Sequence, residues 1–178
     1  MEAELESTKS AQASGQTSGQ TSGQTSGQKR KAFSVALNRG VRVLAQREHS
    51  ETELRRKLLR KGYSAVLVDE VLEYLIANDL QSNERFVESF VRSRTARGFG
   101  PVKIRQELAG RGIAESELEQ VLTESGDHWI DVAKRAREKK FGDGLPSRDE
   151  DGKAWGQQAR FLATRGFPAD LIYRVLAM

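Results

Sequence analysis

Residues 50–62 read Ser-Glu-Thr-Glu-Leu-Arg-Arg-Lys-Leu-Leu-Arg-Lys-Gly, and residues 100–112 read Gly-Pro-Val-Lys-Ile-Arg-Gln-Glu-Leu-Ala-Gly-Arg-Gly. Each stretch places two large apolar residues four positions apart, on one face of a helix, and ends on the glycine that commonly follows a helix. The first opens with a serine and a glutamate three positions later, a capping box in which each side chain caps the other residue's amide. The second places proline at the first helical position. Both stretches therefore predict a short helix.

These short helices are parts of a longer internal repeat. The pair Leu54 and Gly62 recurs as Ile104 and Gly112, fifty residues on, and Gly112 recurs as Gly166, fifty-four residues on. Apolar residues at helical spacing also precede and follow each short helix, so the pattern predicts three units of three helices. Units this small need their neighbours to complete a core, which favours an elongated or curved all-α body. We expect the units to span residues 33–80, 81–125 and 126–178.

The first 32 residues have a different composition. From residue 14 to 28 the sequence cycles through Thr, Ser, Gly and Gln, which offer nothing to bury. Burial of such a segment releases too little free energy to offset the conformational entropy lost on ordering, so we expect residues 1–32 to form a disordered tail. The tail is either a plain spacer or a tether whose basic end, residues 29–31, contacts an acidic surface.

Several classes of chemistry are excluded or disfavoured. The chain has no cysteine, which removes disulfides, thiolate metal sites and cysteine nucleophiles. His49 and His128 are its two histidines, and neither has a partner at metal-ligand spacing. Phosphate-binding and dinucleotide-binding glycine motifs are missing, and adjacent acids such as Asp69 and Glu70 do not share a helix face. We expect a protein that is not an enzyme, with no cofactor, metal or small-molecule substrate.

The chain carries a net charge of +4 and no apolar run near the roughly 20 residues that a membrane-spanning helix needs. Its first residues are acidic at Glu2, Glu4 and Glu6, unlike the basic and then apolar start of a secretory signal. We therefore expect a cytoplasmic protein, monomeric and without a membrane partner.

Basic residues recur on the second helix of each unit. In one interpretation, a stack of units presents these residues as a stripe that binds carboxylates or phosphates. In the other, their charges only keep a helix face solvated while their long stems cover the edges of the core. The residues concerned are Arg55, Lys61, Arg105, Arg111, Arg160 and Arg165.

A second basic cluster surrounds the Gly98-Phe99-Gly100 turn. Arg92, Arg94 and Arg97 precede this turn and Lys103 follows it, at the start of a helix that would attract anions. The alternative is an ordinary inter-helix loop with Phe99 folded inward. The aromatic residues of the last unit fit a core better than a binding platform.

Four segments, in order, resemble the RecX family of regulatory proteins. They are Glu53-Leu-Arg-Arg-Lys-Leu-Leu-Arg-Lys-Gly-Tyr63, Glu84-Arg-Phe-Val-Glu-Ser-Phe-Val-Arg92, Gly98-Phe-Gly-Pro-x-Lys-Ile-Arg-Gln-Glu-Leu108 and Arg160-Phe-Leu-x-x-Arg-Gly-Phe167. The resemblance covers about residues 34–177 and implies three tandem three-helix units. It also implies a modulator that binds the RecA recombinase filament on DNA, lies in its groove, and mainly inhibits its recombinase, ATPase and coprotease activities.

The expected contact residues follow from the basic clusters, because the family motifs are mostly core positions. They are Arg92, Arg94, Arg97, Lys103, Arg105, Arg111, Arg55 and Lys61. The loop at residues 142–152 matches no motif and inherits no role. DNA would be bound weakly or through the filament.

Two other functions stay open at this point. A stand-alone DNA-binding protein is one, because three-helix units resemble helix-turn-helix domains, although those usually act as symmetric dimers. That alternative requires strong, salt-dependent binding to bare DNA. A general protein-interaction scaffold of stacked helices is the other.

Overall fold

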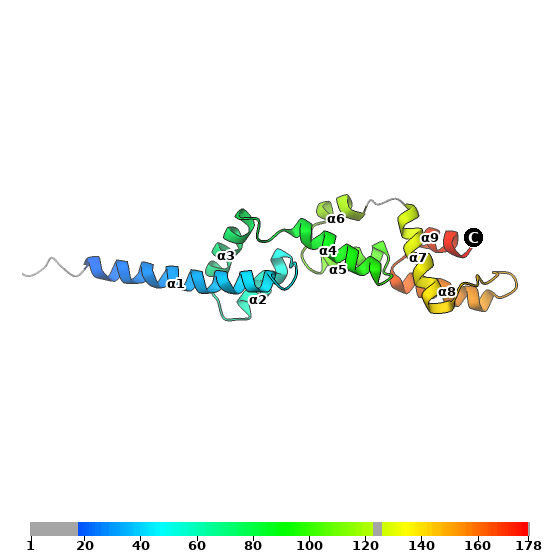
Figure 1. Ribbon diagram of the computed structural model, residues 1–178, viewed down its shortest axis with the longest axis horizontal. Coiled ribbons are helices and arrows are strands. Elements are labelled where there is room, and N and C mark those ends of the chain that lie inside the picture. The colour runs from blue at the N-terminus through cyan, green and yellow to red at the C-terminus, as the bar shows by residue number, and fades with distance from the viewer. Residues whose placement is uncertain (1–17, 123–125, 178) are drawn as a thin grey trace, which may run out of the picture.

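A computed structural model describes residues 18–122 and 126–177 of the 178-residue chain. Within these ranges the fold is all-helical, with nine helices and no strand. The helices form an elongated row of three groups, here called repeats 1, 2 and 3 (Figure 1). Repeat 1 contains α1 (Ser18–Leu44), α2 (Glu51–Leu59) and α3 (Ala65–Ala77). Repeat 2 contains α4 (Asn83–Ala96), α5 (Pro101–Ala109) and α6 (Glu115–Leu122). Repeat 3 contains α7 (Gly126–Phe141), α8 (Gly152–Arg165) and α9 (Ala169–Leu176).

The N-terminal helix α1 corrects one expectation. The composition of residues 18–32 predicts a disordered tail, but these residues are helical and extend α1 beyond the body (Figure 1). Once the packed part of a helix has formed, each further turn adds hydrogen bonds without a new nucleation step. Residues 26–32 are exposed and Phe33 is the first half-buried side chain, so packing does begin where the sequence predicts. The expected tail at residues 1–17 lies outside the described residues.

The helix ends follow the sequence pattern, with one correction. The Ser50 hydroxyl accepts from the amide of Glu53 at 3.1 Å, as expected of an N-cap. The Glu53 carboxylate instead makes ion pairs with Arg47 at 3.1 Å and Arg111 at 3.2 Å, and among the described residues it accepts no hydrogen bond from the Ser50 amide. The capping box is therefore half formed, because two guanidinium groups bind the carboxylate that would complete it.

The apolar core is divided in two. The core of repeat 1 is its own and centres on Leu54, Leu58, Val71, Leu72 and Leu75. Repeats 2 and 3 share a single core, which includes residues from all six of their helices. The expectation that neighbouring units share a core is therefore confirmed for repeats 2 and 3, whereas the described core of repeat 1 is separate.

Repeat 1 meets repeat 2 through a polar joint. The Gln81 amide donates to the carbonyl of His49 at 3.2 Å, and the Glu51 amide donates to Asn83 at 3.0 Å. Arg85 pairs with Glu48 at 3.1 Å. These buried and partly buried hydrogen bonds fix the geometry of this joint, while the apolar cores on its two sides stay separate.

His49 is fully buried beside this polar joint. Its Nδ1 lies 2.8 Å from the Arg47 carbonyl, and its Nε2 lies 2.8 Å from the Lys57 ammonium. A neutral ring satisfies both contacts by donating from Nδ1 and accepting at Nε2. Burial lowers the pKa of His49, and the nearby Arg47 and Lys57 charges lower it further.

Candidate anion-binding surface

Four of the eight expected contact residues are engaged within the chain. Arg94 pairs with Glu107 at 2.7 Å, and Arg111 pairs with Glu53 at 3.2 Å. Arg55 pairs with Asp69 and Glu51, and Arg105 pairs with Glu115. The hydrogen bond to Asp69 raises the pKa of Arg55. These arginines neutralise acids of their own repeats or joints, so they are poor candidates for an external anion.

Arg94 and Arg111 also pack against aromatic rings. The Arg94 guanidinium lies 5.0 Å from the centre of the Phe90 ring and 5.5 Å from that of Phe99. Arg111 lies 4.6 Å from the Phe90 ring. Phe99 is half-buried against the shared core, as the ordinary-loop alternative for the Gly-Phe-Gly turn requires. These two arginines support the fold of repeat 2 through cation–π contacts and ion pairs.

The other four expected residues make no ion pair with any described residue. Arg92, Arg97 and Lys61 are exposed, and Lys103 is half-buried. The backbone of Lys103 lies against Gly166 at the joint between repeats 2 and 3. The predicted stripe on α2, α5 and α8 is thus interrupted, because some of its members hold the repeats together and only some are available.

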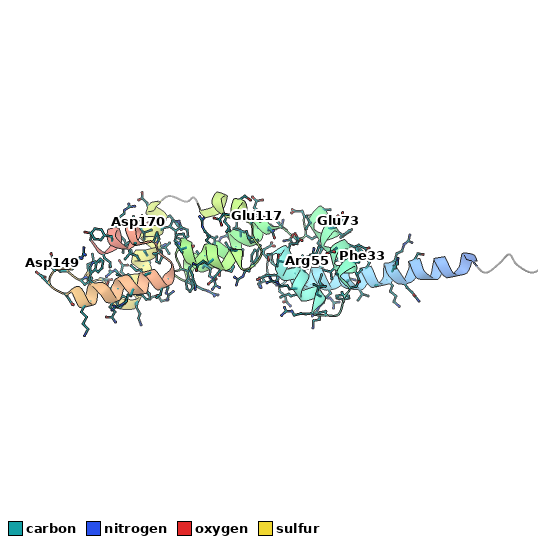
Figure 2. The ribbon with its side chains drawn as sticks, turned by 180° about the vertical axis from the view of Figure 1, so that it is seen from behind. Phe33, Arg55, Glu73, Glu117, Asp149 and Asp170 are labelled. Atoms are coloured by element: carbon teal, nitrogen blue, oxygen red, sulfur yellow. The ribbon has the colours of Figure 1, made fainter. Side chains whose placement is uncertain are left out.

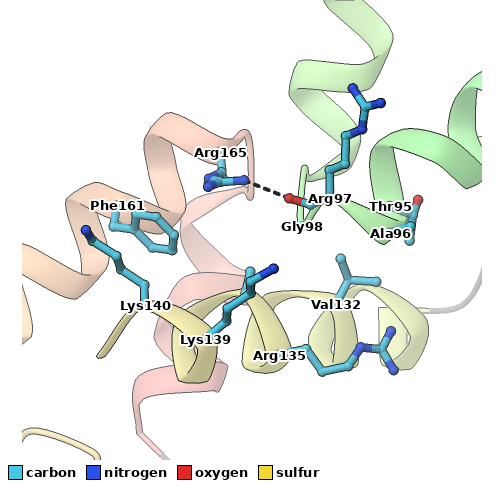
Figure 3. A pocket seen from close by; sticks show the side chains of 11 residues that line it. Thr95, Ala96, Arg97, Gly98, Val132, Arg135, Lys139, Lys140, Phe161 and Arg165 are labelled. Atoms are coloured by element: carbon cyan, nitrogen blue, oxygen red, sulfur yellow. Dashed lines mark hydrogen bonds between the residues drawn. The ribbon is translucent and has the colours of Figure 1, made fainter. Parts of the chain in front are cut away.

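Arg97 lines a basic cavity between repeats 2 and 3, here called the joint hollow (Figure 3). Its volume is about 460 Å³, and its walls come from α4, α7 and α8. None of the described residues that line it is acidic. The lining residues are Thr95, Ala96, Arg97, Gly98, Val132, Arg135, Ala136, Lys139, Lys140, Phe161 and Arg165. Five cations around one cavity without a described carboxylate give a strongly positive potential.

The hydrogen bonds around the joint hollow hold its shape. Arg165 donates to the Arg97 carbonyl at 2.7 Å, and its guanidinium lies over the rings of Phe99 at 4.9 Å and Phe161 at 5.1 Å. Arg165 is thereby fixed, while Arg135, Lys139 and Lys140 are exposed. A fixed wall beside long, exposed cations suits a phosphate or carboxylate group. Such a group is bound by its charge, whatever the sequence of the partner that carries it.

A second basic cavity lies on repeat 1, between α1 and α2, and is here called the α1–α2 hollow. Its volume is about 450 Å³, and its described lining again contains no acidic side chain. Its lining residues are Arg39, Arg42, Val43, Gln46, Lys57, Leu58, Arg60 and Lys61. The molecule therefore presents two separate positive cavities along its length.

Sequence reasoning missed most of the cations in both hollows. Arg39 and Arg42 lie on the first helix of a unit, whereas the predicted stripe follows only the second helices. Arg135, Lys139 and Lys140 belong to the run Lys-Arg-Ala-Arg-Glu-Lys-Lys at residues 134–140, whose density of charge was a usable signal. The remaining arginine of that run, at position 137, is buried and donates to the Gly144 carbonyl at 2.8 Å.

Metal sites and membrane spans are not found in the part of the chain that the structure describes. No group of three or more His, Cys, Asp or Glu side chains there is placed to hold a metal ion. None of the described helices has the length and apolar character to cross a membrane.

Family models match the chain in three consecutive segments. The models for the first, second and third three-helix domains of RecX match residues 36–75, 82–122 and 128–176. The chain is 42% identical over 135 residues to "Regulatory protein RecX" of Pseudomonas putida, covering 76% of this chain and 85% of the relative. It is 44% identical over 132 residues to the protein of that name from Halorhodospira halophila, covering 74% and 80%.

Solved structures agree with the fold. A crystal structure of regulatory protein RecX matches with a TM-score of 0.74 at 22% identity, covering 90% of this chain and 79% of that one. RecX from Lactobacillus salivarius matches with a TM-score of 0.70 at 20% identity, covering 83% and 96%. Together with the matched domain models and the curated relatives, the order of three-helix units identifies the chain: it belongs to the RecX family of regulatory proteins.

Proposed function

We propose that this chain is a non-enzymatic regulator that binds the RecA filament on DNA in the cytoplasm. In this proposal it mainly inhibits strand exchange, ATP hydrolysis and coprotease activity. The observation that carries the proposal is the pair of basic hollows, without acids in their described linings, on an elongated body of three repeats. A filament is a repetitive polyanionic surface, and two modest sites on one body bind such a surface with avidity.

The exposed cations are the proposed contacts. In the joint hollow they are Arg97, Arg135, Lys139 and Lys140, and in the α1–α2 hollow they are Arg39, Arg42, Arg60 and Lys61. Arg92 and Lys103, which make no ion pair with a described residue, remain proposed contacts outside the two cavities. DNA phosphates and acidic side chains of the filament are both suitable partners for these groups.

The stand-alone DNA-binding alternative is disfavoured by the third helix of each repeat. In a helix-turn-helix domain the helix that enters the major groove supplies the base contacts and is usually rich in basic or amide side chains. Here α3 and α6 contain no Lys or Arg and carry several acids. The single basic residue of α9, Arg174, pairs with Asp127 at 3.6 Å. Bases in a major groove would therefore meet acidic or apolar helices.

The test is a titration of the full chain into RecA assembled on single-stranded DNA, with ATP hydrolysis as the readout. We expect hydrolysis to fall as the protein is added. A fall at substoichiometric protein indicates capping or destabilisation of filaments, and a fall only near saturation indicates coating of the groove. Undiminished hydrolysis on intact filaments at every ratio contradicts the proposal. Strong, salt-dependent, sequence-selective binding to bare DNA alongside that result supports the DNA-binding alternative.

A further inference from the structure

The middle helices of the three repeats, α2, α5 and α8, follow one another end to end along the molecule (Figure 1). At the joint between repeats 2 and 3, the first turn of α5 meets the last turn of α8. The Gly100 amide donates to the Arg165 carbonyl at 2.8 Å, and the Val102 amide donates to the Gly166 carbonyl at 3.1 Å. The N-terminal end of one middle helix thus satisfies the C-terminal carbonyls of the next.

The joint between repeats 1 and 2 uses the same arrangement with different atoms. The Ser50 hydroxyl, at the start of α2, donates to the Arg111 carbonyl beyond the end of α5 at 2.8 Å. Thr52 lies so close to Gly112 that no side chain fits at that glycine. The Arg111 guanidinium completes the contact by pairing with Glu53 at 3.2 Å. Each joint therefore places the start of one middle helix on the glycine end of the following one.

The corresponding end of α2 is uncovered. Gly62 has φ +87°, close to +79° at Gly112 and +88° at Gly166, so the three helix ends have the same backbone shape. A Cβ at Gly112 or Gly166 would collide with the preceding repeat, whereas no described atom lies within 4 Å of one at Gly62. Lys61 takes the position of Arg111 and Arg165 in the repeat and makes no ion pair with a described residue. In both internal joints the glycine end of a middle helix is covered by the preceding repeat, but in repeat 1 the same kind of helix end, at Gly62, is exposed.

The opposite end of the row has the complementary features. Asp149, Glu150 and Asp151 are exposed where α8 begins, and the described residues give them no ion pair. Asp151 caps α8 by accepting from the Ala154 amide at 3.0 Å, and no described atom lies near a Cβ at Gly152. Figure 2 places Asp149 at one tip of the molecule and Arg55 of α2 in the repeat at the other. This tip presents acids at a helix start, and the α2 end presents Arg60 and Lys61 at a helix end.

We propose that the Lys61–Gly62 end of α2 receives the start of α8, with its acids at 149–151, from a second copy of this chain. The contact continues the row of middle helices in the same direction as the internal joints. It is heterologous, so it produces open arrays and no closed dimer. One helix end on another is a small contact, so copies separate at low concentration and associate where a filament concentrates them. That last consequence rests on the proposed function, but the contact itself does not.

Disulfide cross-linking of the full chain tests the contact without RecA or DNA. The chain has no cysteine, so single variants report only on the positions chosen. We expect an oxidised mixture of Arg60→Cys and Asp149→Cys to form the 60–149 disulfide in several-fold excess over either homodimer, as measured by mass spectrometry of the linked peptides. Ser93→Cys, on the exposed face of α4, is the control partner for Arg60→Cys. A 60–149 yield no greater than the 60–93 yield overturns the proposal.

A charge exchange provides the second readout. Lys61→Glu and Glu150→Lys should each lower self-association of the chain at high concentration, measured by sedimentation equilibrium. Mixing the two variants should restore it, because the carboxylate introduced at position 61 then meets the ammonium introduced at position 150, and each unaltered end meets its normal partner. Unchanged association in both single variants overturns the proposal. Lys61 is also a proposed filament contact, so the proposed function is tested with the unaltered chain on RecA hydrolysis, and neither outcome above changes that result.

Discussion

Gly62, Gly112 and Gly166 share a left-handed backbone but differ in what surrounds them. We predict that Gly62→Ala costs about 1 kcal/mol of stability, from the backbone conformation alone. Gly166→Ala carries that cost and also places a methyl group against the backbone of Lys103, which adds about 1–3 kcal/mol. Urea unfolding of both variants measures the difference. Equal losses would contradict the close joint between α5 and α8.

His49 gives a prediction about pH. Burial, the largest cause, and the charges of Arg47 and Lys57 lower its pKa below the usual value of 6.5, whereas the hydrogen bond to the Arg47 carbonyl and the charge of Glu53 act in the opposite direction. The unfolded chain then binds more protons than the folded chain just below pH 6.5, so stability is full above this value and falls as the pH decreases through the folded pKa. We expect wild type to lose more stability than His49→Gln does when the pH is lowered from about 7.5 to about 5.5, on either side of the ordinary histidine pKa. Parallel urea titrations at the two pH values check this, and an equal loss in both proteins would refute it.

At the scale of the helix, α4 carries both an engaged and an available arginine. Arg94 pairs with Glu107 and lies between Phe90 and Phe99, whereas Arg92 is exposed. We predict that Arg94→Ala lowers stability by about 1–3 kcal/mol, because it leaves the half-buried Glu107 unpaired. Arg92→Ala should change stability by less than about 0.5 kcal/mol. Thermal unfolding distinguishes the two, and a neutral Arg94→Ala would show that the ion pair and rings contribute little.

The helices themselves were predictable from sequence, because their signals are local. Ser50, Pro101 and the three end glycines each act within one turn, and all stand where the pattern placed them. The ion-pair partners of the basic side chains could not be predicted in this way, because they lie far away in the sequence. Arg111 finds Glu53 58 positions away, and Arg94 finds Glu107 13 positions away. Charge pairing between helices is set by how helices and repeats meet, which no spacing within one helix encodes.

The joint hollow was beyond sequence reasoning for the same reason. Arg97, Arg135 and Arg165 come from three helices and two repeats, and each is an ordinary surface arginine of its own helix pattern. What the sequence did offer was the density of cations at residues 134–140. The start of α1 was mispredicted because composition reports what a segment can bury and says little about a helix extending from a packed part.

At the scale of the whole molecule, the division of the core predicts two cooperative units. Leu72 lies in the core of repeat 1, and Leu162 lies in the core shared by repeats 2 and 3. Leu72→Ala and Leu162→Ala should each cost about 2–5 kcal/mol locally. Hydrogen exchange should show faster opening confined to repeat 1 for the first variant, and spread over repeats 2 and 3 for the second. Uniform acceleration along the chain in both variants would mean one cooperative unit.

The elongated body carries one basic hollow on repeat 1, between α1 and α2, and another between repeats 2 and 3. We propose that binding depends on the cations that the fold leaves without an ion pair, and that the paired arginines support the fold. A rigid spacing between two sites matters only if both engage one long partner, which a nucleoprotein filament provides and a short ligand does not.

The most direct test is the affinity of the full chain for RecA filaments on single-stranded DNA, measured by fluorescence anisotropy at fixed salt. Lys139→Glu/Lys140→Glu, which reverses two cations of the joint hollow, should weaken binding about tenfold or more. Lys29→Glu/Lys31→Glu makes the same change in charge on the exposed N-terminal half of α1 and serves as the matched control, with little effect expected. Equal weakening by both variants would mean that net charge alone governs binding. Unchanged affinity in the hollow variant would contradict the claim that the joint hollow binds the filament.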